Sequence, residues 1–301
     1  MNLSIIIVSY NTKELLRKCL ESVIRDQLSG ISYQGSVVGK NKKPVTDNQL
    51  PVTEIIVVDN ASKDGSVEYL RELVDNSPTT DHRSPITLRL IENKENFGFA
   101  KAANQGIRIA KGENILLLNS DTKLTENSLK SLLEFAEKVQ PAVIGAQMLN
   151  PDGSVQGSCF LLPTVKRAIL EYWLGKKDYF SKYYPKGDRP VEVEAVSGGA
   201  MLVSKEIVNE VGMLDERYFM YFEDLDFCRR ARKAGYKIYY LPSSKIIHEH
   251  GASGKKLAEP KDQWRRLVPS SKIYHGSLNH FLITFIILSG QKIRKLFTGK
   301  K

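Results

Sequence analysis

Acidic and amide side chains stand directly after an apolar run in the middle of the chain. Residues 115–118 (ILLL) are followed by Asn119, Ser120 and Asp121. A short apolar run between polar residues is typical of a strand buried on both faces. Ligands bind beyond the carboxyl ends of such strands, where a carboxylate can hold a divalent cation against a diphosphate. A turn aspartate that caps the next helix is the alternative, and this run alone leaves both open.

A second acidic group, within residues 222–227 (FEDLDF), places three carboxylates in four positions. Neighbouring carboxylates raise one another's pKa, which suits a general base that deprotonates an acceptor hydroxyl. We expect Asp224 to be this base and Glu223 to hold the acceptor hydroxyl, while Asp226 is structural. The alternative is that all three only complement the dipole at a helix N-terminus.

Two histidines, His248 and His250, follow a late apolar run. Imidazole is a common ligand of transition metals. Asp121, one of these histidines and the oxygens of a diphosphate would nearly fill an octahedral shell around Mn²⁺ or Mg²⁺. A solvated loop histidine is the alternative.

Residues suited to a nucleotide occur near the N-terminus. Asp59 follows the apolar run 54–58 and can accept the imide N–H of uracil or thymine, while Tyr10 packs on the ring. The segment 96–100 (NFGFA) reads as a helix start whose backbone N–H groups face a phosphate. A turn aspartate at position 59 and a simple N-cap near position 96 are the alternatives.

The elements that must position these residues alternate between strand and helix. Strands are predicted at 3–8, 54–58, 88–92 and 115–118, with helices between them, which indicates a parallel, Rossmann-like sheet. Further strands are predicted at 142–149 and 237–241, with a turn at 151–153 (PDG). Residues 29–53 are rich in Gly, Ser, Lys, Asn and Pro, and we expect an inserted surface loop there.

The positive charge of the chain is concentrated at its C-terminus. Residues 255–301 contain eleven Lys or Arg and two acidic residues, and so supply nine of the net ten positive charges. A nucleic-acid-binding domain carries its basic excess on the domain itself. We therefore expect no nucleic acid as a partner, and an anionic membrane surface instead.

The apolar stretch 278–288 and its basic flank suggest how the tail is used. It is too short to span a membrane, so an interfacial helix on a membrane surface is predicted from 278–301. A helix docked on the core is the alternative. Three widely spaced cysteines and the lack of a signal peptide favour a cytoplasmic location, with peripheral attachment at the inner face of the cell membrane.

Taken together, these segments resemble the family 2 glycosyltransferases, and within them the rhamnosyltransferase-like group. The resemblance covers roughly residues 1–255 in the family's order. Its matching stretches are IIIVSYN (5–11), EIIVVDNASKDGS (54–66), NFGFAKAANQGI (96–107), LLLNSDT (116–122), SGGAMLVSKEI (197–207), GMLDERYFMYFEDLDFCRRARKAGYKI (212–238) and HEHGAS (248–253).

The resemblance implies a GT-A fold, an α/β architecture with a mixed Rossmann-like sheet flanked by helices and, here, a basic C-terminal helical tail. Residues 1–125 would be the nucleotide-sugar-binding half, 126–255 the acceptor-binding and catalytic half, and 256–301 the tail. The resemblance assigns nucleotide binding to Tyr10, Asn11, Asp59, Asn96, Gly98, Asn104 and Asn119. It assigns sugar or acceptor binding to Ser197, Gly198, Gly199 and Glu223, metal binding to Asp121 and His248, and catalysis to Asp224.

The implied activity is inverting, metal-dependent transfer of a sugar from a nucleotide sugar to a glycan or lipid-linked glycan, in cell-surface polysaccharide synthesis. Rhamnose from dTDP-rhamnose is the first choice of donor. A UDP-hexose and a non-catalytic glycan-binding homologue remain open. A sugar nucleotidyltransferase would need a Gly-rich loop after the first strand, which VSYNTKE (8–14) lacks. The family's metal motif is often Asp-x-Asp, and Asn119 in its first position implies a weaker dependence on metal.

Overall fold

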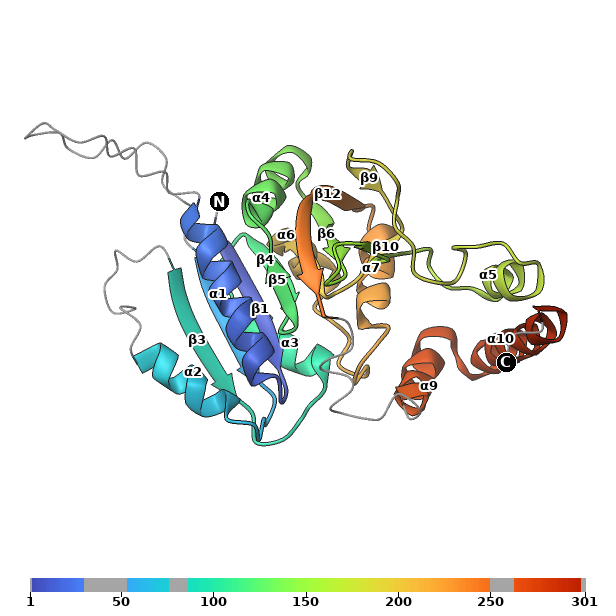
Figure 1. The fold of residues 1–301 in the computed structure, drawn as a ribbon, viewed down its shortest axis with the longest axis horizontal. Helices are drawn as coiled ribbons and strands as arrows, with labels where there is room; N and C mark the ends of the chain where they lie inside the picture. The colour runs from blue at the N-terminus through green and yellow to red at the C-terminus, as the bar shows by residue number, and fades with distance from the viewer. Residues whose placement is uncertain (1, 30–52, 76–85, 250–262, 299–301) are drawn as a thin grey trace, which may run out of the picture.

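The computed structural model describes residues 2–29, 53–75, 86–249 and 263–298. The expected loop lies almost entirely outside these residues, as does His250. A β-sheet runs through the main body, helices cover both of its faces, and a smaller helical part stands at one end (Figure 1).

The first half of the sheet is parallel. Its strands are β1 (Leu3–Ser9), β2 (Thr53–Asp59), β3 (Ile86–Glu92) and β4 (Asn114–Asn119), in the order β3-β2-β1-β4. The connecting helices are α1 (Lys13–Ser29), α2 (Ser66–Asp75) and α3 (Phe99–Ile109). All four predicted strands are confirmed, and the continuous apolar runs at β1, β2 and β4 suit strands that are covered on both faces.

The second half makes the sheet mixed, as predicted. Beyond β4 the order is β11-β6-β12-β5, formed by β11 (Ala200–Ser204), β6 (Ala142–Leu149), β12 (Lys237–His248) and β5 (Thr122–Leu124). β11 is antiparallel to both β4 and β6, whereas β12 is parallel to β6. The predicted end of β12 at residue 241 is wrong. The strand continues to His248 through a register shift between Leu241 and Lys245, where Pro242 cannot donate a ladder hydrogen bond.

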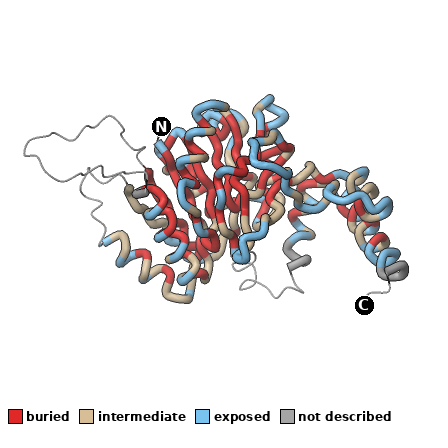
Figure 2. Tube along the Cα trace, turned by 45° about the horizontal axis from the view of Figure 1, so that its top comes forward, coloured by how far each residue is buried: buried red, intermediate tan, exposed pale blue. Residues whose placement is uncertain are grey.

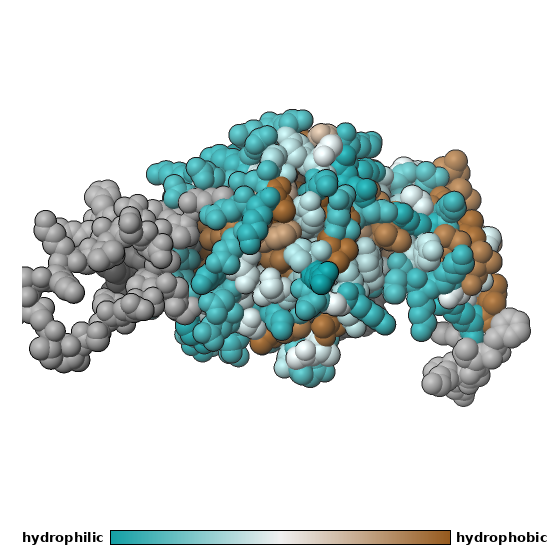
Figure 3. Space-filling view, turned by 90° about the horizontal axis from the view of Figure 1, so that it is seen from above, coloured by the Kyte–Doolittle hydropathy of each residue, from teal (hydrophilic) through white to brown (hydrophobic). Residues whose placement is uncertain are grey.

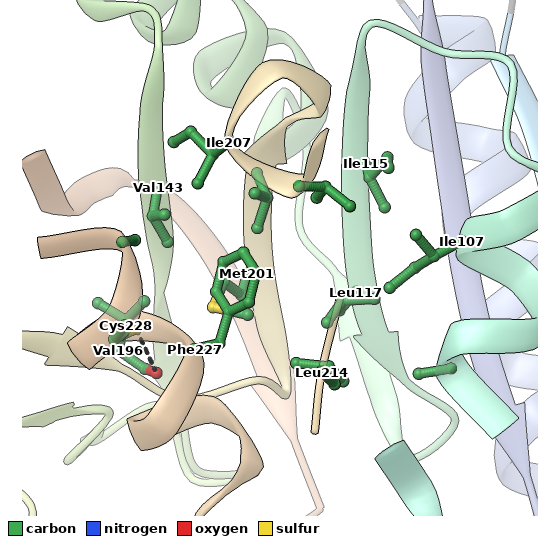
Figure 4. Close-up of a cluster of buried hydrophobic side chains, with 14 of the residues drawn as sticks. Ile107, Ile115, Leu117, Val143, Val196, Met201, Ile207, Leu214, Phe227 and Cys228 are labelled. Atoms are coloured by element: carbon green, nitrogen blue, oxygen red, sulfur yellow. Dashed lines mark hydrogen bonds between the residues drawn. The ribbon is translucent and has the colours of Figure 1, made fainter. Parts of the chain in front are cut away.

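Two apolar cores lie on opposite faces of this sheet, and its strands are mostly buried (Figure 2). One packs α1, α2 and α4 (Ser128–Val139) on the sheet. The other packs α3, α6 (Lys205–Val211) and α7 (Glu223–Lys233) on the opposite face. Figure 4 shows this second core, which contains Phe227 and Cys228 of α7 and Met201 of β11 and in which the Cys228 thiol donates to the carbonyl of Val196. The start of α7 is thereby fixed near the carboxyl end of β4.

The helical part at one end holds α5 (Val165–Ala168), the short helix η1 (Ile169–Trp173), α9 (Gln263–His275) and α10 (Ser277–Thr298). The short strands β7 (Val155–Gln156) and β9 (Val191–Glu192) pair with β6 and β12 of the main sheet, whereas β8 (Cys159–Phe160) and β10 (Ala195–Val196) form a separate two-stranded sheet. Ile283 and Ile286 of α10 pack on Ala168, so one face of α10 is docked on the protein. No helix among the described residues is long and apolar enough to cross a membrane.

Candidate active site

A cavity of about 470 Å³ opens at the carboxyl ends of the parallel strands. Eleven of the fourteen predicted site residues line it: Tyr10, Asn96, Gly98, Asn119, Asp121, Ser197, Gly198, Gly199, Glu223, Asp224 and His248. These residues come from both halves of the chain. The topology brings them together because β11 reverses direction beside β4 and carries the preceding glycine loop to the same edge.

Asp121 and His248 face each other inside this cavity. Asp121 lies in the turn between β4 and β5, so the alternative that it caps a helix is wrong. Its Oδ1 is 3.4 Å from Nε2 of His248, and Nδ2 of Asn119 is 3.5 Å from the same nitrogen. Asp121 and His248 are both buried, and β5 pairs with β12 at Thr122 and His248. The strand pairing therefore holds the two side chains together.

A hydrogen-bond chain sets the orientation of the imidazole. Nδ1 of His248 lies 2.7 Å from Oε1 of Gln156. The Gln156 amide is itself oriented, because its nitrogen donates to Oδ1 of Asn150 at 2.9 Å. The amide oxygen therefore faces the ring and accepts the Nδ1 proton, which leaves the Nε2 lone pair directed toward Asp121.

This pair has the chemistry of a divalent-cation site. A carboxylate and a neighbouring imidazole nitrogen suit Mn²⁺, and the carboxylate suits Mg²⁺. No group of three or more His, Cys, Asp or Glu side chains suited to a metal occurs in the described part of the chain. Asp121 and His248 would thus supply two ligands, and oxygens of a bound diphosphate and water would supply the rest.

Asp224 lies in the first turn of α7 and enters the same cavity from the opposite half. Its Oδ2 accepts the N–H of Gly198 at 3.0 Å, and its Oδ1 accepts the N–H of Leu225 at 2.8 Å. A Cβ at position 198 would lie 3.4 Å from Cβ of Asp224. Glycine at this position lets the loop backbone come close enough to hold the carboxylate.

The two neighbouring carboxylates have different environments. Glu223 is buried, its Oε2 has no hydrogen-bond partner, and burial, followed by the charge of Asp224, raises its pKa. Asp226 instead accepts from Arg229 at 2.6 Å and from Arg230 at 2.8 Å. A raised pKa makes Glu223 a hydrogen-bond donor near neutral pH, and the ion pairs make Asp226 a brace for α7.

Asp59 and Asn11 lie beside the cavity without lining it. Oδ1 of Asp59 accepts the N–H of Ser62 at 2.8 Å, whereas its buried Oδ2 has no partner, and burial raises the pKa of this carboxyl. Oδ1 of Asn11 accepts the N–H of Lys63 at 2.7 Å, and the N–H of Asn11 donates to Oγ of Ser62 at 2.8 Å. Asn11 therefore joins two loops, while Asp59 keeps one acceptor for a ligand.

Asn104, which the sequence places in the nucleotide-binding set, does not line the cavity. This residue is buried in α3, where its side chain donates to the carbonyl of Leu214 at 2.8 Å and accepts the Leu214 N–H at 3.1 Å. A hydrogen bond to Glu216 at 3.0 Å completes its contacts. Asn104 fastens the segment before α7 instead of contacting the cavity.

Two backbone donors at the predicted phosphate-binding start of α3 have partners within the protein. The N–H of Gly98 donates to Oδ1 of Asn96 at 2.9 Å, and the N–H of Phe99 donates to the carbonyl of Phe219 at 2.7 Å. These two backbone donors are therefore occupied within the protein. A phosphate bound at this segment would therefore need donors other than these two N–H groups.

Sequence analysis missed Asn60, Gln156 and Lys182. Asn60 lines the cavity and donates to Oδ1 of Asn96 at 2.8 Å, and its place directly after Asp59 was a usable signal. Lys182, between η1 and β9, brings a positive charge to the cavity. Nothing in the sequence marks Gln156, because its role depends on a strand pairing between β6 and β7.

The family model described as Glycosyl transferase family 2 matches residues 4–211, more than half of the chain. The chain belongs to this family. The glycosyltransferases similar to it include the N-acetylglucosaminyl-diphospho-decaprenol L-rhamnosyltransferase of Mycobacterium tuberculosis, 29% identical over 66% of this chain and 67% of that protein. The dTDP-rhamnosyl transferase RfbF of Shigella flexneri is 26% identical over 54% of this chain and 52% of that protein.

A solved structure of similar fold supports the GT-A architecture. The mannosyltransferase PcManGT of Pyrobaculum calidifontis, solved with GDP-Man and Mn²⁺, aligns with a TM-score of 0.58 at 15% identity, over the whole of this chain and 76% of that one. This likeness concerns the fold. The predicted α/β sheet flanked by helices is thus confirmed, and so is the expectation of a family 2 glycosyltransferase.

Proposed function

We propose that the protein moves a hexose from a nucleotide-sugar donor to a hydroxyl of a glycan or lipid-linked glycan, with inversion at the anomeric carbon. The observation that carries this proposal is the meeting of Asp224 with the Asp121–His248 pair in one cavity of about 470 Å³. A diphosphate bound at the pair would have its sugar in the same enclosed space as the carboxylate. This arrangement suits a single in-line displacement.

Each side chain would have a distinct task. Asp121 and His248 would hold Mn²⁺ or Mg²⁺, which when bound offsets charge on the departing diphosphate. Asp224 accepts the acceptor's proton while the acceptor oxygen bonds to C1 and the bond from C1 to the diphosphate breaks. The N–H of Gly198 keeps the carboxylate oriented. Glu223, protonated because of its raised pKa, donates a hydrogen bond to an acceptor oxygen.

The donor base would be uracil or thymine. The unpaired Oδ2 of Asp59 can accept an imide N–H, and Tyr10 supplies an aromatic ring at the neighbouring strand end. dTDP-rhamnose is the first choice because rhamnosyl transfer appears in the names of the Mycobacterium and Shigella relatives. A UDP-hexose is the alternative. A glycan-binding homologue without activity is disfavoured by the presence of Asp121, Asp224 and His248.

The protein would work as a peripheral enzyme at the cytoplasmic face of the cell membrane, in cell-surface polysaccharide synthesis. The support is an exposed apolar stripe along α10, formed by Leu278, Phe281, Leu282, Phe285 and Leu288. Apolar residues gather along the outer edge of this end of the molecule in Figure 3. A helix with such a face and a basic flank suits an anionic bilayer surface.

A donor panel tests the proposal. We would measure thermal stability with dTDP, UDP and GDP, each with and without Mn²⁺, since a ligand of the native state raises apparent stability. Transfer from dTDP-rhamnose and UDP-glucose would then be compared between the wild type and Asp224→Asn. We expect the variant to bind the nucleotide normally but to lose about 10²–10⁴-fold in kcat. Asp188→Asn, an exposed carboxylate, is the control, and normal turnover by Asp224→Asn would refute the assignment.

A further inference from the structure

A second cavity adjoins the first. It measures about 660 Å³ and is lined by residues 162–165, by the end of α7 and by the junction of α9 and α10. Pro163 lines both cavities. Phe222 lines the first, and its ring lies 5.2 Å from that of Tyr274 and 5.7 Å from that of His275, which line the second. The two cavities therefore adjoin each other at Pro163 and Phe222.

The second cavity is cationic. Arg229, Arg232 and Lys233 line it, and no Asp or Glu is among its lining residues. Arg229 is committed to the protein, because it pairs with Asp226 and lies 4.0 Å over the Tyr274 ring. The other two cations are more available. Burial, together with the charge of Arg229, lowers the pKa of His275 to about 4, so this ring stays neutral in the positive field.

Arg232 and Lys233 are exposed and weakly engaged. Arg232 lies 3.9 Å from Glu194, but that carboxylate is already held by Arg167 at 2.6 and 2.7 Å. Within the described part of the chain, no ion pair involves Lys233. Cations in the last turn of α7 also complement the helix dipole. That effect accounts for their sign, but not for the hollow that they line next to the first cavity.

An apolar surface begins where this cavity ends. Asn279 of α10 lines the cavity, and the exposed stripe of α10 starts at the preceding residue, Leu278. From there the stripe continues through Phe285 to Leu288. A cationic hollow followed directly by an apolar helix face matches a ligand with an anionic head and a hydrocarbon chain.

We propose that the second cavity binds the diphosphate of a lipid-diphosphate-linked acceptor sugar. This inference rests on the glycosyltransferase function proposed above and names its acceptor class. Arg232 and Lys233 hold the diphosphate, the hydrocarbon chain follows the α10 stripe into the membrane, and the sugar passes Pro163 toward Asp224. The diphosphate thus selects acceptors by their lipid-proximal end, while the chemistry takes place in the first cavity.

Binding of farnesyl diphosphate to the full chain tests this proposal by calorimetry in EDTA. We expect Arg232→Gln/Lys233→Gln to weaken binding at least about tenfold. Lys130→Gln/Lys138→Gln removes the same charge from α4 and should leave the affinity unchanged. Asp121→Asn should also leave it unchanged, because in EDTA the metal-dependent donor site does not contribute. Inorganic pyrophosphate and farnesol, tested in parallel, should each bind more weakly than farnesyl diphosphate.

Each contrary result overturns the inference. Equal affinity for inorganic pyrophosphate would identify a site for a free anion, and equal affinity for farnesol would identify the apolar stripe alone. Unchanged binding by Arg232→Gln/Lys233→Gln would place the diphosphate elsewhere. The failure of the proposed function is distinguishable, since it appears as absent sugar transfer to every acceptor, while the farnesyl diphosphate titration still decides the role of this cavity.

Discussion

Glu223 is a carboxyl group that the fold keeps neutral. Its burial, and then the neighbouring charge of Asp224, raise its pKa from 4.5 to about 8. The folded state therefore binds the proton more tightly than the unfolded chain. The resulting stabilisation is complete below pH 4.5 and is lost as the pH rises toward 8.

Glu223→Gln removes this titration while keeping the shape of the side chain. Because one pKa unit corresponds to about 1.4 kcal/mol, the wild type should lose about 1–3 kcal/mol more than the variant between pH 5.5 and 8.5. Denaturant unfolding at both pH values measures the difference. Glu192→Gln is the control, since Glu192 is 52% exposed. Parallel losses in wild type and Glu223→Gln would contradict the assigned protonation state.

Gln156 is the positioning residue for His248. Gln156→Leu removes the acceptor of the Nδ1 proton, so the ring loses its fixed orientation. Loss of such an outer partner typically costs about 10–100-fold in metal affinity. Electron paramagnetic resonance of Mn²⁺ titrated with UDP measures this directly.

Two further variants separate this role from general damage. Gln156→Glu keeps an acceptor oxygen and should restore Mn²⁺ affinity. Gln140→Leu breaks an amide hydrogen bond to Asn114, at the opposite end of β4 from the cavity, and should not change it. Equal Mn²⁺ affinity of Gln156→Leu and the wild type would show that His248 is oriented by other contacts.

At the scale of elements, strands could be read from the sequence more reliably than the site. The runs at β1, β2 and β4 are continuous and apolar, and such runs suit a strand buried on both faces. The predicted strand 237–241 was too short, because a register shift between Leu241 and Lys245 lets β12 continue beyond Pro242.

Site residues were predictable where they follow a strand or begin a helix. Asp121 and Asp224 stand at such places, and both line the cavity. Asn104 shares a motif with Asn96, but its position within α3 turns it toward Leu214. The second cavity could not be predicted from the sequence, because it forms between α7 and the C-terminal helices, which are far apart in the chain. Motif order therefore gives the family, and tertiary packing decides which motif residues face the ligand.

Gly98 shows how closely two elements approach at the cavity. It has a φ of +83°, and an added Cβ would overlap the carbonyl oxygen of Phe219. Gly153 has the same φ but no atom within 4 Å of an added Cβ. Gly153→Ala should therefore cost only backbone strain, about 1–2 kcal/mol. Gly98→Ala should cost about 1–3 kcal/mol more because the contact must open.

Thermal unfolding of both glycine variants measures this difference in stability. Gly98→Ala should also weaken UDP binding, since the α3 start and Phe219 move apart at the cavity wall. Equal stability of the two variants would mean that the approach of α3 to the segment before α7 is not tight in solution.

At the scale of the whole molecule, α10 has one face packed on the protein and one face exposed to its surroundings. One face of α10 packs on α5 and η1 through Ile283 and Ile286, which are buried. The opposite face exposes Phe281 and Phe285 at 60% and 63%. The docked helix and the interfacial helix are therefore compatible, because α10 has a separate face for each role.

This separation of faces allows membrane binding to be removed without unfolding the protein. Phe281→Ser/Phe285→Ser/Leu288→Ser changes only exposed side chains, so the melting temperature should shift little, as is usual for surface substitutions within about 0.5 kcal/mol. Cosedimentation with phosphatidylserine vesicles should fall at least about tenfold, since each buried Phe contributes about 1.5–3 kcal/mol. Tyr184→Ser, an exposed aromatic outside α10, is the control. Unchanged cosedimentation of the triple variant would mean that another surface contacts the bilayer. Loss of both binding and stability would mean instead that the exposed face of α10 is needed for folding.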